Sequence, residues 1–362
     1  MCNAFVDNGI DLVLALPEPN IAIKNTTDYI QTRFGISLKF NLLFYKSVYK
    51  NPRLEKYFAY QPVKKLLLRS NAEYVFLRSP KFIKTVLDSG KKLIFESHNN
   101  LLHNKIRLID KYWKRKILKY SMNEQFVLFI CISHNLSKYW KNTGIPPLKL
   151  IGLHDGFSAE KYKTIMDKVI ARNKLDICIN EKIAMYVGSL YPDREVDNIL
   201  FIAKQIPSIT FYIIGGPEKY RSHYFKKANN MKLNNIRFIG HVTHDEVPTY
   251  LFAADILLAL WSRKVPTINY CSPLKVFEYM ASGQSIIAHN FVTIAEVLEN
   301  KVDALLINPD NLESLYLALK NLSSKDSCSM GKSAREKAFK LFTWTHRAKI
   351  LSERLVASSP FI

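Results

Sequence analysis

Short runs of apolar residues alternate with stretches of helical periodicity along almost the whole chain. In the first half, the strand-like runs lie at residues 11–16, 74–77, 92–96, 127–133 and 148–153. In the second half, they lie at residues 183–188, 210–214, 235–239, 255–260, 285–288 and 304–307. Helix-like segments separate them, among them residues 196–205, 244–253, 274–282 and 312–322. This alternation predicts an α/β fold with parallel, doubly wound sheets, and two series of strands fit two Rossmann-like domains better than one.

A polar, mixed segment between Phe157 and Lys182 separates the two series of strands. The sequence therefore predicts an N-terminal domain at residues 1–160 and a C-terminal domain at residues 180–342. A last helix is expected near Lys332–Ala357, after a break at Ser323–Ser329. Its end, residues 343–362, is expected to pack back on the first domain. The chain opens with a helix-like segment, Cys2–Asn8, so the first domain is expected to lack its first strand and loop.

The composition and the cysteine pattern argue against a membrane-spanning, secreted, disulfide-linked or zinc-binding protein. The chain has 362 residues, of which 48% are hydrophobic and 23% charged, an ordinary globular balance. No apolar run approaches the ~20 residues of a membrane-spanning helix, and no signal-peptide pattern stands at the start. The five cysteines are scattered without a paired spacing, which argues against a disulfide framework or a zinc site. These features predict a cytoplasmic protein.

The charge is strongly positive and unevenly distributed. The net charge is +21, to which residues 1–155 contribute +14 and the remainder +7. This predicts anionic partners, namely phospholipid head groups, phosphorylated substrates or nucleic acid. A general enrichment in lysine, asparagine and isoleucine is the alternative explanation.

The segment KYWKRKILKY, residues 111–120, concentrates this charge on a predicted helix. Helical spacing places Trp113, Ile117 and Tyr120 on one stripe, and places four basic residues on the opposite side: Lys111, Lys114, Arg115 and Lys119. The segment is typical of a helix that lies on an anionic membrane. It equally fits a surface helix that packs its apolar stripe on the domain core.

The most informative segment of the second half is YCSPLKVFEYMASG, residues 270–283. Ser272 is a favourable N-cap and Pro273 a favourable first helical residue, so the helix from Leu274 onward would present free backbone N–H groups. Lys275 in the first turn opposes the helix dipole, which a bound phosphate would explain. Glu278 follows one turn later, where it is placed to accept hydrogen bonds from ribose hydroxyls. The alternative is an ordinary capped helix with a surface Lys–Glu pair.

Several other polar or glycine positions follow predicted strands of the same domain: Gly188, Arg194, Gly215, Gly216, Gly240, His241 and Val242. Each turn on its own is compatible with an ordinary loop. Ligands of open α/β sheets bind at the carboxyl ends of strands, so the convergence of these segments predicts a ligand site. In the first domain, His98 follows a strand and is the candidate catalytic residue, although a lone histidine there is more often a loop residue.

The order of these segments resembles that of glycosyltransferase family 4, whose members have the GT-B architecture. NAFVDNGIDLVLAL, LIFESHNN, FICISHNLSKYW and IGLHDGFSAEKY are similar to segments of that family's first domain. MYVGSLYPDREVDNIL, FYIIGGPE, IRFIGHV, ADILLAL, SPLKVFEYMASG and IAEVLENKVDALLINPDN are similar to segments of its second domain. Single motifs are loose, but the ordered set is specific.

The resemblance implies two Rossmann-like domains that face each other across a cleft. It also implies transfer of a hexose-type sugar, with retention, from a nucleotide diphosphate sugar to a glycan or lipid-linked glycan. Bacterial cell-surface polysaccharide or lipopolysaccharide synthesis, on the cytoplasmic face of the membrane, is the implied setting. No cofactor or metal is expected, and no nucleic acid.

The same resemblance implies roles for single residues. His98 would lie beside the transferred sugar. Arg194 and Lys275 would neutralise the diphosphate, and Glu278 would bind the ribose. The remaining donor-binding positions would line the nucleotide: Gly188, Gly215, Gly216, Gly240, His241, Val242, Ser272, Pro273 and Leu274.

The chain departs from the family pattern in three ways. Tyr270 stands where the family often has a glutamate, and Ser189 stands where it often has an arginine. The family's first strand and glycine-rich loop have no counterpart in the sequence. Three alternatives therefore stay open: a nucleotide-sugar epimerase of the same fold, an inactive binding subunit, and, least supported by motifs, a nucleic-acid binder.

Overall fold

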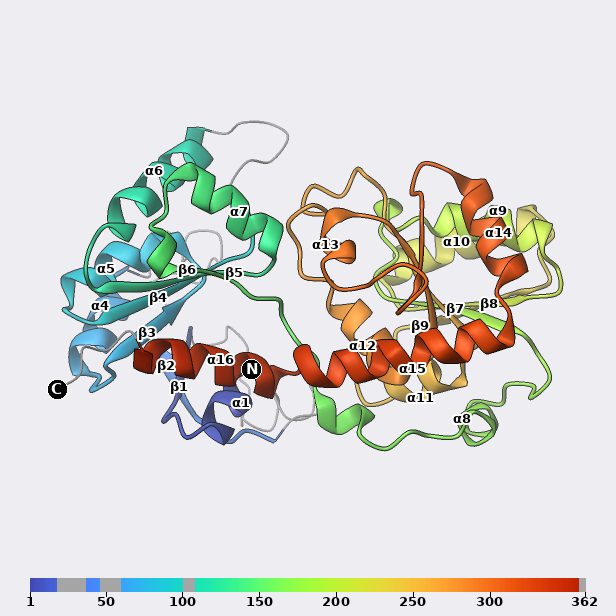
Figure 1. Cartoon of the computed structure of the whole chain (residues 1–362), viewed down its shortest axis with the longest axis horizontal. Coiled ribbons are helices and arrows are strands. Elements are labelled where there is room, and N and C mark those ends of the chain that lie inside the picture. Colours follow the sequence, from blue (N-terminus) through green and yellow to red (C-terminus); the bar gives the residue numbers. More distant parts are fainter. Residues whose placement is uncertain (18–36, 46–59, 100–107, 358–362) are drawn as a thin grey trace. The chain divides into compact units, whose positions relative to one another are not determined.

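The computed structural model describes residues 1–17, 37–45, 60–99 and 108–357, which form two compact α/β units (Figure 1). Unit 1 comprises Met1–His154, Tyr270–Ser272 and Trp344–Ile362. Unit 2 comprises Asp155–Asn269 and Pro273–Thr343. All strand pairs in both units are parallel among the described residues, as the alternating pattern predicts.

Unit 2 contains a six-stranded sheet in the order β12-β11-β10-β7-β8-β9. Its strands are β7 (Ile183–Val187), β8 (Thr210–Ile214), β9 (Ile236–Gly240), β10 (Ile256–Ala259), β11 (Ser285–His289) and β12 (Leu305–Ile307). Its helices are α8 (Lys168–Lys174), α9 (Val196–Gln205), α10 (Glu218–Asn230), α11 (Val247–Ala253), α12 (Leu274–Ser282), α13 (Val292–Ala295), α14 (Leu312–Asn321) and α15 (Ser324–Leu341). The predicted bounds of β8, α9 and α12 agree with these residue for residue.

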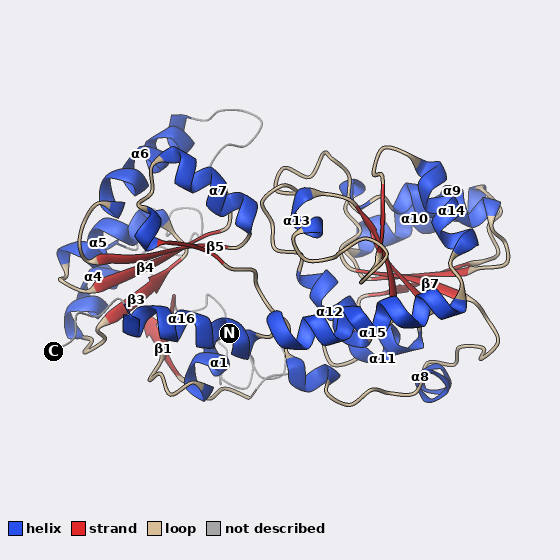
Figure 2. Cartoon of the chain, viewed as in Figure 1, coloured by secondary structure: helices blue, strands red, loops and turns tan. Residues whose placement is uncertain are grey.

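Helices cover both faces of this sheet, with α9, α10 and α14 on one face and α11, α12 and α15 on the other (Figures 1 and 2). Because both faces are covered, β7 and β10 are buried along their whole length. The chain begins the sheet at β7, adds β8 and β9 on one side, and then crosses to β10 on the other side. This reversal of strand order between β7 and β10 is the place where open α/β sheets bind ligands.

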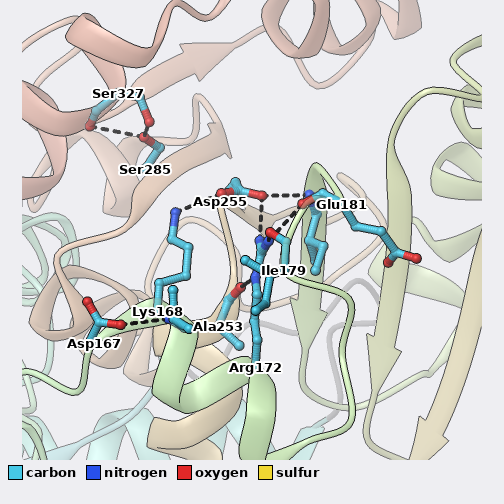
Figure 3. A network of polar contacts seen from close by, with 11 residues as sticks. Asp167, Lys168, Arg172, Ile179, Glu181, Ala253, Asp255, Ser285 and Ser327 are labelled. Carbon is cyan, nitrogen blue, oxygen red and sulfur yellow. Dashed lines mark hydrogen bonds and ion pairs between the residues drawn. The ribbon is translucent and has the colours of Figure 1, made fainter.

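At the amino ends of β7 and β10, a polar network joins α8 to the sheet (Figure 3). The guanidinium of Arg172, 2% exposed, donates to the carbonyls of Ile179, Glu181 and Ala253, and forms an ion pair of 2.8 Å with Asp255. Asp255 also accepts from the Ile183 N–H and from Lys168. Arg172 therefore satisfies carbonyls of the segments that lead into β7 and β10.

Unit 1 contains a four-stranded sheet, β3-β4-β5-β6, and a separate parallel pair, β1-β2. The strands are β1 (Val13–Pro17), β2 (Asn41–Tyr45), β3 (Tyr74–Leu77), β4 (Lys92–Ser97), β5 (Phe126–Cys131) and β6 (Leu150–Gly152). The helices are α1 (Cys2–Asp7), α4 (Tyr60–Arg69), α5 (Ile83–Asp88), α6 (Leu108–Ser121), α7 (His134–Thr143) and α16 (Trp344–Ala357). Short 3₁₀ turns in the two units lie at Pro80–Phe82, Pro147–Lys149, Ala159–Tyr162 and Pro192–Arg194. Strand β2 was not predicted.

Helix α6 packs its apolar stripe on the core, the second of the two explanations of residues 111–120. Ile117 is fully buried, and Tyr120 packs against the same cluster of apolar side chains. This stripe is therefore not available to a membrane. The outward side carries Lys111, Arg115 and Lys119, all exposed.

The end of the chain differs from the prediction of one helix after a serine-rich break. Ser323 caps α15 by accepting from the Asp326 N–H, so the serine-rich stretch starts a helix. The break falls at Phe342–Thr343, where the Phe157 N–H donates to the Phe342 carbonyl. The following helix, α16, belongs to unit 1, where it packs against α1, and residues 358–362 lie outside the described residues.

Within the described part of the chain, none of the helices has both the length and the apolar character needed to span a membrane.

The network around Arg172 makes a stability prediction for unit 2. Removing one member of a buried ion pair leaves the other charge uncompensated, so Arg172→Met should lower the free energy of unfolding by about 3–5 kcal/mol. The matched variant Lys168→Met loses a pair with Asp255 whose lysine is 40% exposed, and should cost less than about 1 kcal/mol. Hydrogen exchange of the β7 and β10 amides measures both; equal effects would contradict the role given to Arg172.

Candidate functional site

Three strand ends of unit 2 are held together through the backbone. The Gly188 N–H, just after β7, donates to the Ile214 carbonyl at 2.9 Å. The Gly215 N–H, just after β8, donates to the Gly240 carbonyl of β9 at 2.6 Å. The Leu190 N–H donates to the Gly216 carbonyl at 2.7 Å. The four glycines predicted to line a ligand therefore lie at one edge of one sheet.

Glycine is required at Gly215 for two reasons. Its φ is +129°, which side-chain-bearing residues rarely adopt. A Cβ there would also lie 1.9 Å from the Gly188 carbonyl oxygen. At Gly188, a Cβ would lie 3.1 Å from the Lys275 Nζ. The lack of a side chain at Gly215 thus leaves space for the backbone of Gly188. The lack of a side chain at Gly188 leaves space for Lys275 of α12.

Helix α12 starts at Leu274, as predicted, beside the strand-order reversal. Pro273, and not Ser272, occupies the N-cap position, and no side chain caps the helix. The prediction of Ser272 as the cap is wrong, because residues Tyr270–Ser272 belong to unit 1, where Ser272 Oγ lies 3.5 Å from His154 Nδ1. Leu274 is the first helical residue and is 50% exposed, so the uncapped first turn of α12 is open at this point.

Lys275 is enclosed by aromatic rings. Its Nζ lies 4.0 Å from the centre of the Tyr186 ring and 4.7 Å from the centre of the Trp261 ring. Among the described residues, this buried nitrogen has no hydrogen-bond partner. Ring faces attract a cation but cannot accept the three hydrogen bonds that an ammonium offers.

The electrostatics around Lys275 disfavour its charge. Burial lowers the pKa of the Lys275 ammonium well below its usual range, and the positive charge of Arg194 lowers that pKa further. Arg194 ends the 3₁₀ turn Pro192–Arg194, and its Nε lies 3.3 Å from Ser189 Oγ. Two cationic side chains are therefore close enough to repel each other at the carboxyl end of β7. An anion bound here would favour both charges.

Glu278 lies one turn beyond Lys275, yet no ion pair joins the two among the described residues. The alternative of an ordinary helix with a surface Lys–Glu pair therefore does not apply. Burial raises the pKa of the Glu278 carboxyl to about 7, although the charge of Lys161 acts in the opposite direction. A carboxyl with such a pKa changes its charge at physiological pH. It is poised to respond to hydrogen-bond donors.

Three aromatic residues of the site were not predicted from the sequence. Tyr186 and Trp261 enclose Lys275. Tyr279 donates its O–H to the Val187 carbonyl at 3.0 Å and accepts from the Val187 N–H at 2.8 Å, which fixes the end of β7 to α12. Tyr186 lies within β7, Tyr279 within α12, and Trp261 just after β10; aromatic residues at such positions look like ordinary core in a sequence, so no signal marked them.

The last two predicted donor-binding positions follow β9. Gly240 is buried, His241 is exposed and Val242 is half-buried. They lie at the same edge of the sheet as Gly215, whose N–H binds the Gly240 carbonyl.

His98 lies in unit 1, directly after β4. Its Nε2 is 2.7 Å from Glu96 Oε1, and 37% of its side chain is exposed. The last residue of the LIFESHNN segment, Asn100, lies outside the described residues. His98 is thus accessible and held by a carboxylate, which suits a residue that touches a substrate.

Taken from unit 2 alone, the arrangement can hold a phosphorylated ligand. It offers a helix N-terminus, an arginine, an unpartnered lysine, and a carboxyl one turn away for hydroxyl groups.

Residues 181–325 match the family described as "Glycosyl transferases group 1". The chain is 25% identical over 188 residues to a putative glycosyltransferase, YtcC, of Bacillus subtilis, which covers 48% of this chain and 44% of that protein. It is 24% identical over 272 residues to the chitobiosyldiphosphodolichol beta-mannosyltransferase of Candida albicans, which covers 66% of this chain and 57% of that protein. The chain thus spans about half the length of these relatives.

Solved structures resemble the chain over almost its full length. HepE of Anabaena, in complex with UDP and glucose, has a TM-score of 0.74 at 14% identity and covers 98% of this chain and 95% of its own. Sucrose-phosphate synthase of Thermosynechococcus elongatus has a TM-score of 0.75 at 15% identity and covers 99% and 92%. These similarities confirm the predicted α/β, GT-B fold class and the predicted resemblance to glycosyltransferases.

The close packing of Gly215 against the Gly188 carbonyl, which we call the interlock of the strand ends, predicts that Gly215 and Gly216 respond differently to substitution. Gly215→Ala places its methyl group against the Gly188 carbonyl and should lower the free energy of unfolding by about 2–3 kcal/mol. Gly216→Ala is the matched control, because its Cβ meets nothing closer than the Glu218 nitrogen at 3.6 Å. Urea unfolding measures both. A Gly215→Ala protein as stable as the control would contradict the interlock.

Proposed function

We propose that this protein transfers a sugar from a nucleotide diphosphate sugar to a glycan or lipid-linked glycan. The observation that carries the proposal is the Lys275 side-chain nitrogen, buried between Tyr186 and Trp261 without a hydrogen-bond partner among the described residues. A buried charge without a partner costs several kcal/mol. Burial and the charge of Arg194 disfavour the ammonium form of Lys275, and an anion bound at this uncapped helix start would favour it, so the site is suited to an anionic ligand.

The chemistry of sugar transfer fits this electrostatic arrangement. Breaking the bond between sugar and diphosphate builds negative charge on the leaving oxygen. Lys275, Arg194 and the first-turn N–H groups of α12 would stabilise that charge without reorganising. Because these groups supply the positive charge, we propose that transfer needs no metal or other cofactor.

Further donor contacts follow from the same geometry. Glu278 is proposed to accept hydrogen bonds from ribose hydroxyls. The residues that follow β7, β8 and β9 are proposed to line the nucleotide. His98 of unit 1 is proposed to contact the transferred sugar. HepE binds UDP and UDP-glucose according to its structures, so UDP-sugars are the first donors to test.

The stereochemical outcome is proposed to be retention, with a hexose as the transferred sugar. One relative is named a beta-mannosyltransferase, so the anomeric configuration of the product has to be measured directly. Proton NMR of the product made from an α-linked donor gives it, since an α-linked product indicates retention and a β-linked product inversion.

The acceptor side is proposed to work at an anionic membrane, in bacterial cell-surface polysaccharide synthesis. The outward side of α6 carries Lys111, Arg115 and Lys119, beside exposed Leu108 and Tyr112. Such a surface would bind anionic head groups by charge. Equal sedimentation with anionic and with neutral vesicles would contradict this part of the proposal.

Replacing Lys275 tests the function. Lys275→Met removes a buried polar nitrogen that has no hydrogen-bond partner among the described residues, so it should raise the melting temperature of the free protein by about 2–4 °C. It should also remove the stabilisation by UDP-glucose or another bound donor, and lower kcat/KM for transfer by about 10²–10³-fold. Thermal shift and a donor-consumption assay with glycan acceptors measure these effects.

The control is Lys204→Met, an exposed lysine of α9 in the same unit. It should change neither stability nor donor binding. A destabilised Lys275→Met protein that still binds donors as the wild type does would contradict the anion site. Donor binding without transfer would indicate a binding subunit, and conversion of the donor to its epimer would indicate an epimerase.

Glu278 predicts a pH dependence. Its pKa of about 7 means that about a tenth of the carboxyl is ionised at pH 6 and about nine tenths at pH 8. The ionised form is the better acceptor for ribose hydroxyls, so donor affinity should rise by up to about tenfold between these pH values. The diphosphate of a UDP-sugar does not titrate in this range. Calorimetry should show the increase in the wild type, and Glu278→Gln should abolish it; an unchanged slope in the variant would remove Glu278 from the site.

A further inference from the structure

Glu96 is the most completely enclosed charged side chain of unit 1. It stands near the carboxyl end of β4 and has no solvent-exposed surface. One carboxylate oxygen, Oε1, lies 2.7 Å from His98 Nε2 and 2.7 Å from Arg78 Nε. The other, Oε2, lies 2.7 Å from Arg347 Nη2.

Arg347 comes from the last helix, α16, and is 1% exposed. Its Nε donates to the His154 carbonyl at 2.8 Å, and Nη2 also reaches the Leu153 carbonyl at 3.4 Å. The guanidinium is therefore fixed by the backbone after β6. Because arginine stays protonated in proteins, it gives Glu96 a permanent cationic partner.

The surroundings of Glu96 keep it ionised. Burial alone would raise its pKa, but the hydrogen bond with His98 and the charges of Arg347 and Arg78 outweigh burial and lower the pKa to about 2. An ionised carboxylate accepts hydrogen bonds and donates none. The hydrogen between Glu96 and His98 therefore belongs to His98 Nε2.

We infer that Glu96 is a positioning residue that fixes His98 with its hydrogen on Nε2 and leaves Nδ1 to face the substrate, and that Arg347 of the C-terminal helix holds Glu96 in place for this task. The catalytic part of this inference rests on the proposed function. The neutral imidazole then presents a lone pair at Nδ1, which accepts a hydrogen bond from a sugar hydroxyl. The opposite tautomer would present a donor instead.

Because Arg347 contacts only one of the two carboxylate oxygens, it determines how the side chain of a Glu96→Gln variant is oriented. Arg347 faces Oε2 with donors only, so the glutamine carbonyl oxygen takes that side. The amide nitrogen then replaces Oε1 and donates to His98 Nε2. The hydrogen of His98 should therefore move to Nδ1, while Arg78, whose side chain is 54% exposed, can turn toward solvent.

Long-range ¹H–¹⁵N correlation spectra of the full-length protein, labelled at histidine nitrogens and recorded at a pH where the imidazole is neutral, report the tautomer. His98→Asn assigns the signals. The expected result is hydrogen on Nε2 in the wild type and on Nδ1 in Glu96→Gln. Glu73→Gln is the matched control, because Glu73 pairs with the exposed Lys92 amine, in the same unit. It should leave the His98 signals unchanged.

Kinetics form the second readout. Glu96→Gln should lower kcat by about 100-fold or more and leave KM for the donor within about twofold, since the wrong tautomer affects the reacting sugar. A wild-type His98 with hydrogen on Nδ1 overturns the inference even if the variant does not fold. Glu96→Gln with the wild-type tautomer also overturns it. Expected tautomers in a protein that transfers no sugar would refute the proposed function and support the placement of Glu96.

Discussion

The cost of burying a charge governs both candidate sites of this protein. The chain buries the carboxylate of Glu96 and the side-chain nitrogen of Lys275, and their surroundings differ. Glu96 has ion pairs with Arg78 and Arg347 and a hydrogen bond with His98. Lys275 has two aromatic rings and no hydrogen-bond acceptor among the described residues. A buried charge with ion-pair partners keeps one protonation state. A buried ionisable group without such partners is stabilised in its charged form when a counter-charge binds.

The backbone of unit 2 makes the unpaired charge possible. Gly188 leaves space for the lysine amine, and Gly215 leaves space for the Gly188 carbonyl. Tyr279 binds both polar groups of Val187, so the end of β7 and helix α12 are held to each other beside the lysine. At the opposite ends of β7 and β10, Arg172 and Asp255 satisfy the carbonyls and the amide where the strands begin. Hydrogen bonds therefore fix both ends of the strands, and the glycines at the carboxyl ends leave room for Lys275.

Local chemistry decided what could be predicted from the sequence. The buried strands of unit 2 and helix α9 were predicted well, because period and strand length are local properties. Lys275 and Glu278 were proposed as site residues from their positions on a single helix, and the structure confirms that this helix spans Leu274–Ser282. The cap at Ser272 was wrong because a side chain's partner depends on tertiary contacts. Likewise, Glu96 and Arg347 lie 251 residues apart, and nothing in either segment indicates the other.

Under the proposed function, the two buried groups suit two different tasks. A group that orients a substrate has to keep the same protonation state throughout, and full pairing provides that constancy for Glu96 and, through it, for His98. A group that stabilises charge developing on a leaving oxygen has to interact more strongly with the transition state than with the free enzyme's own residues. Internal pairing of Lys275 with Glu278 would have weakened that difference. Among the described residues no ion pair joins Lys275 to Glu278, one helical turn apart, and this supports the proposed anion site over an ordinary surface helix.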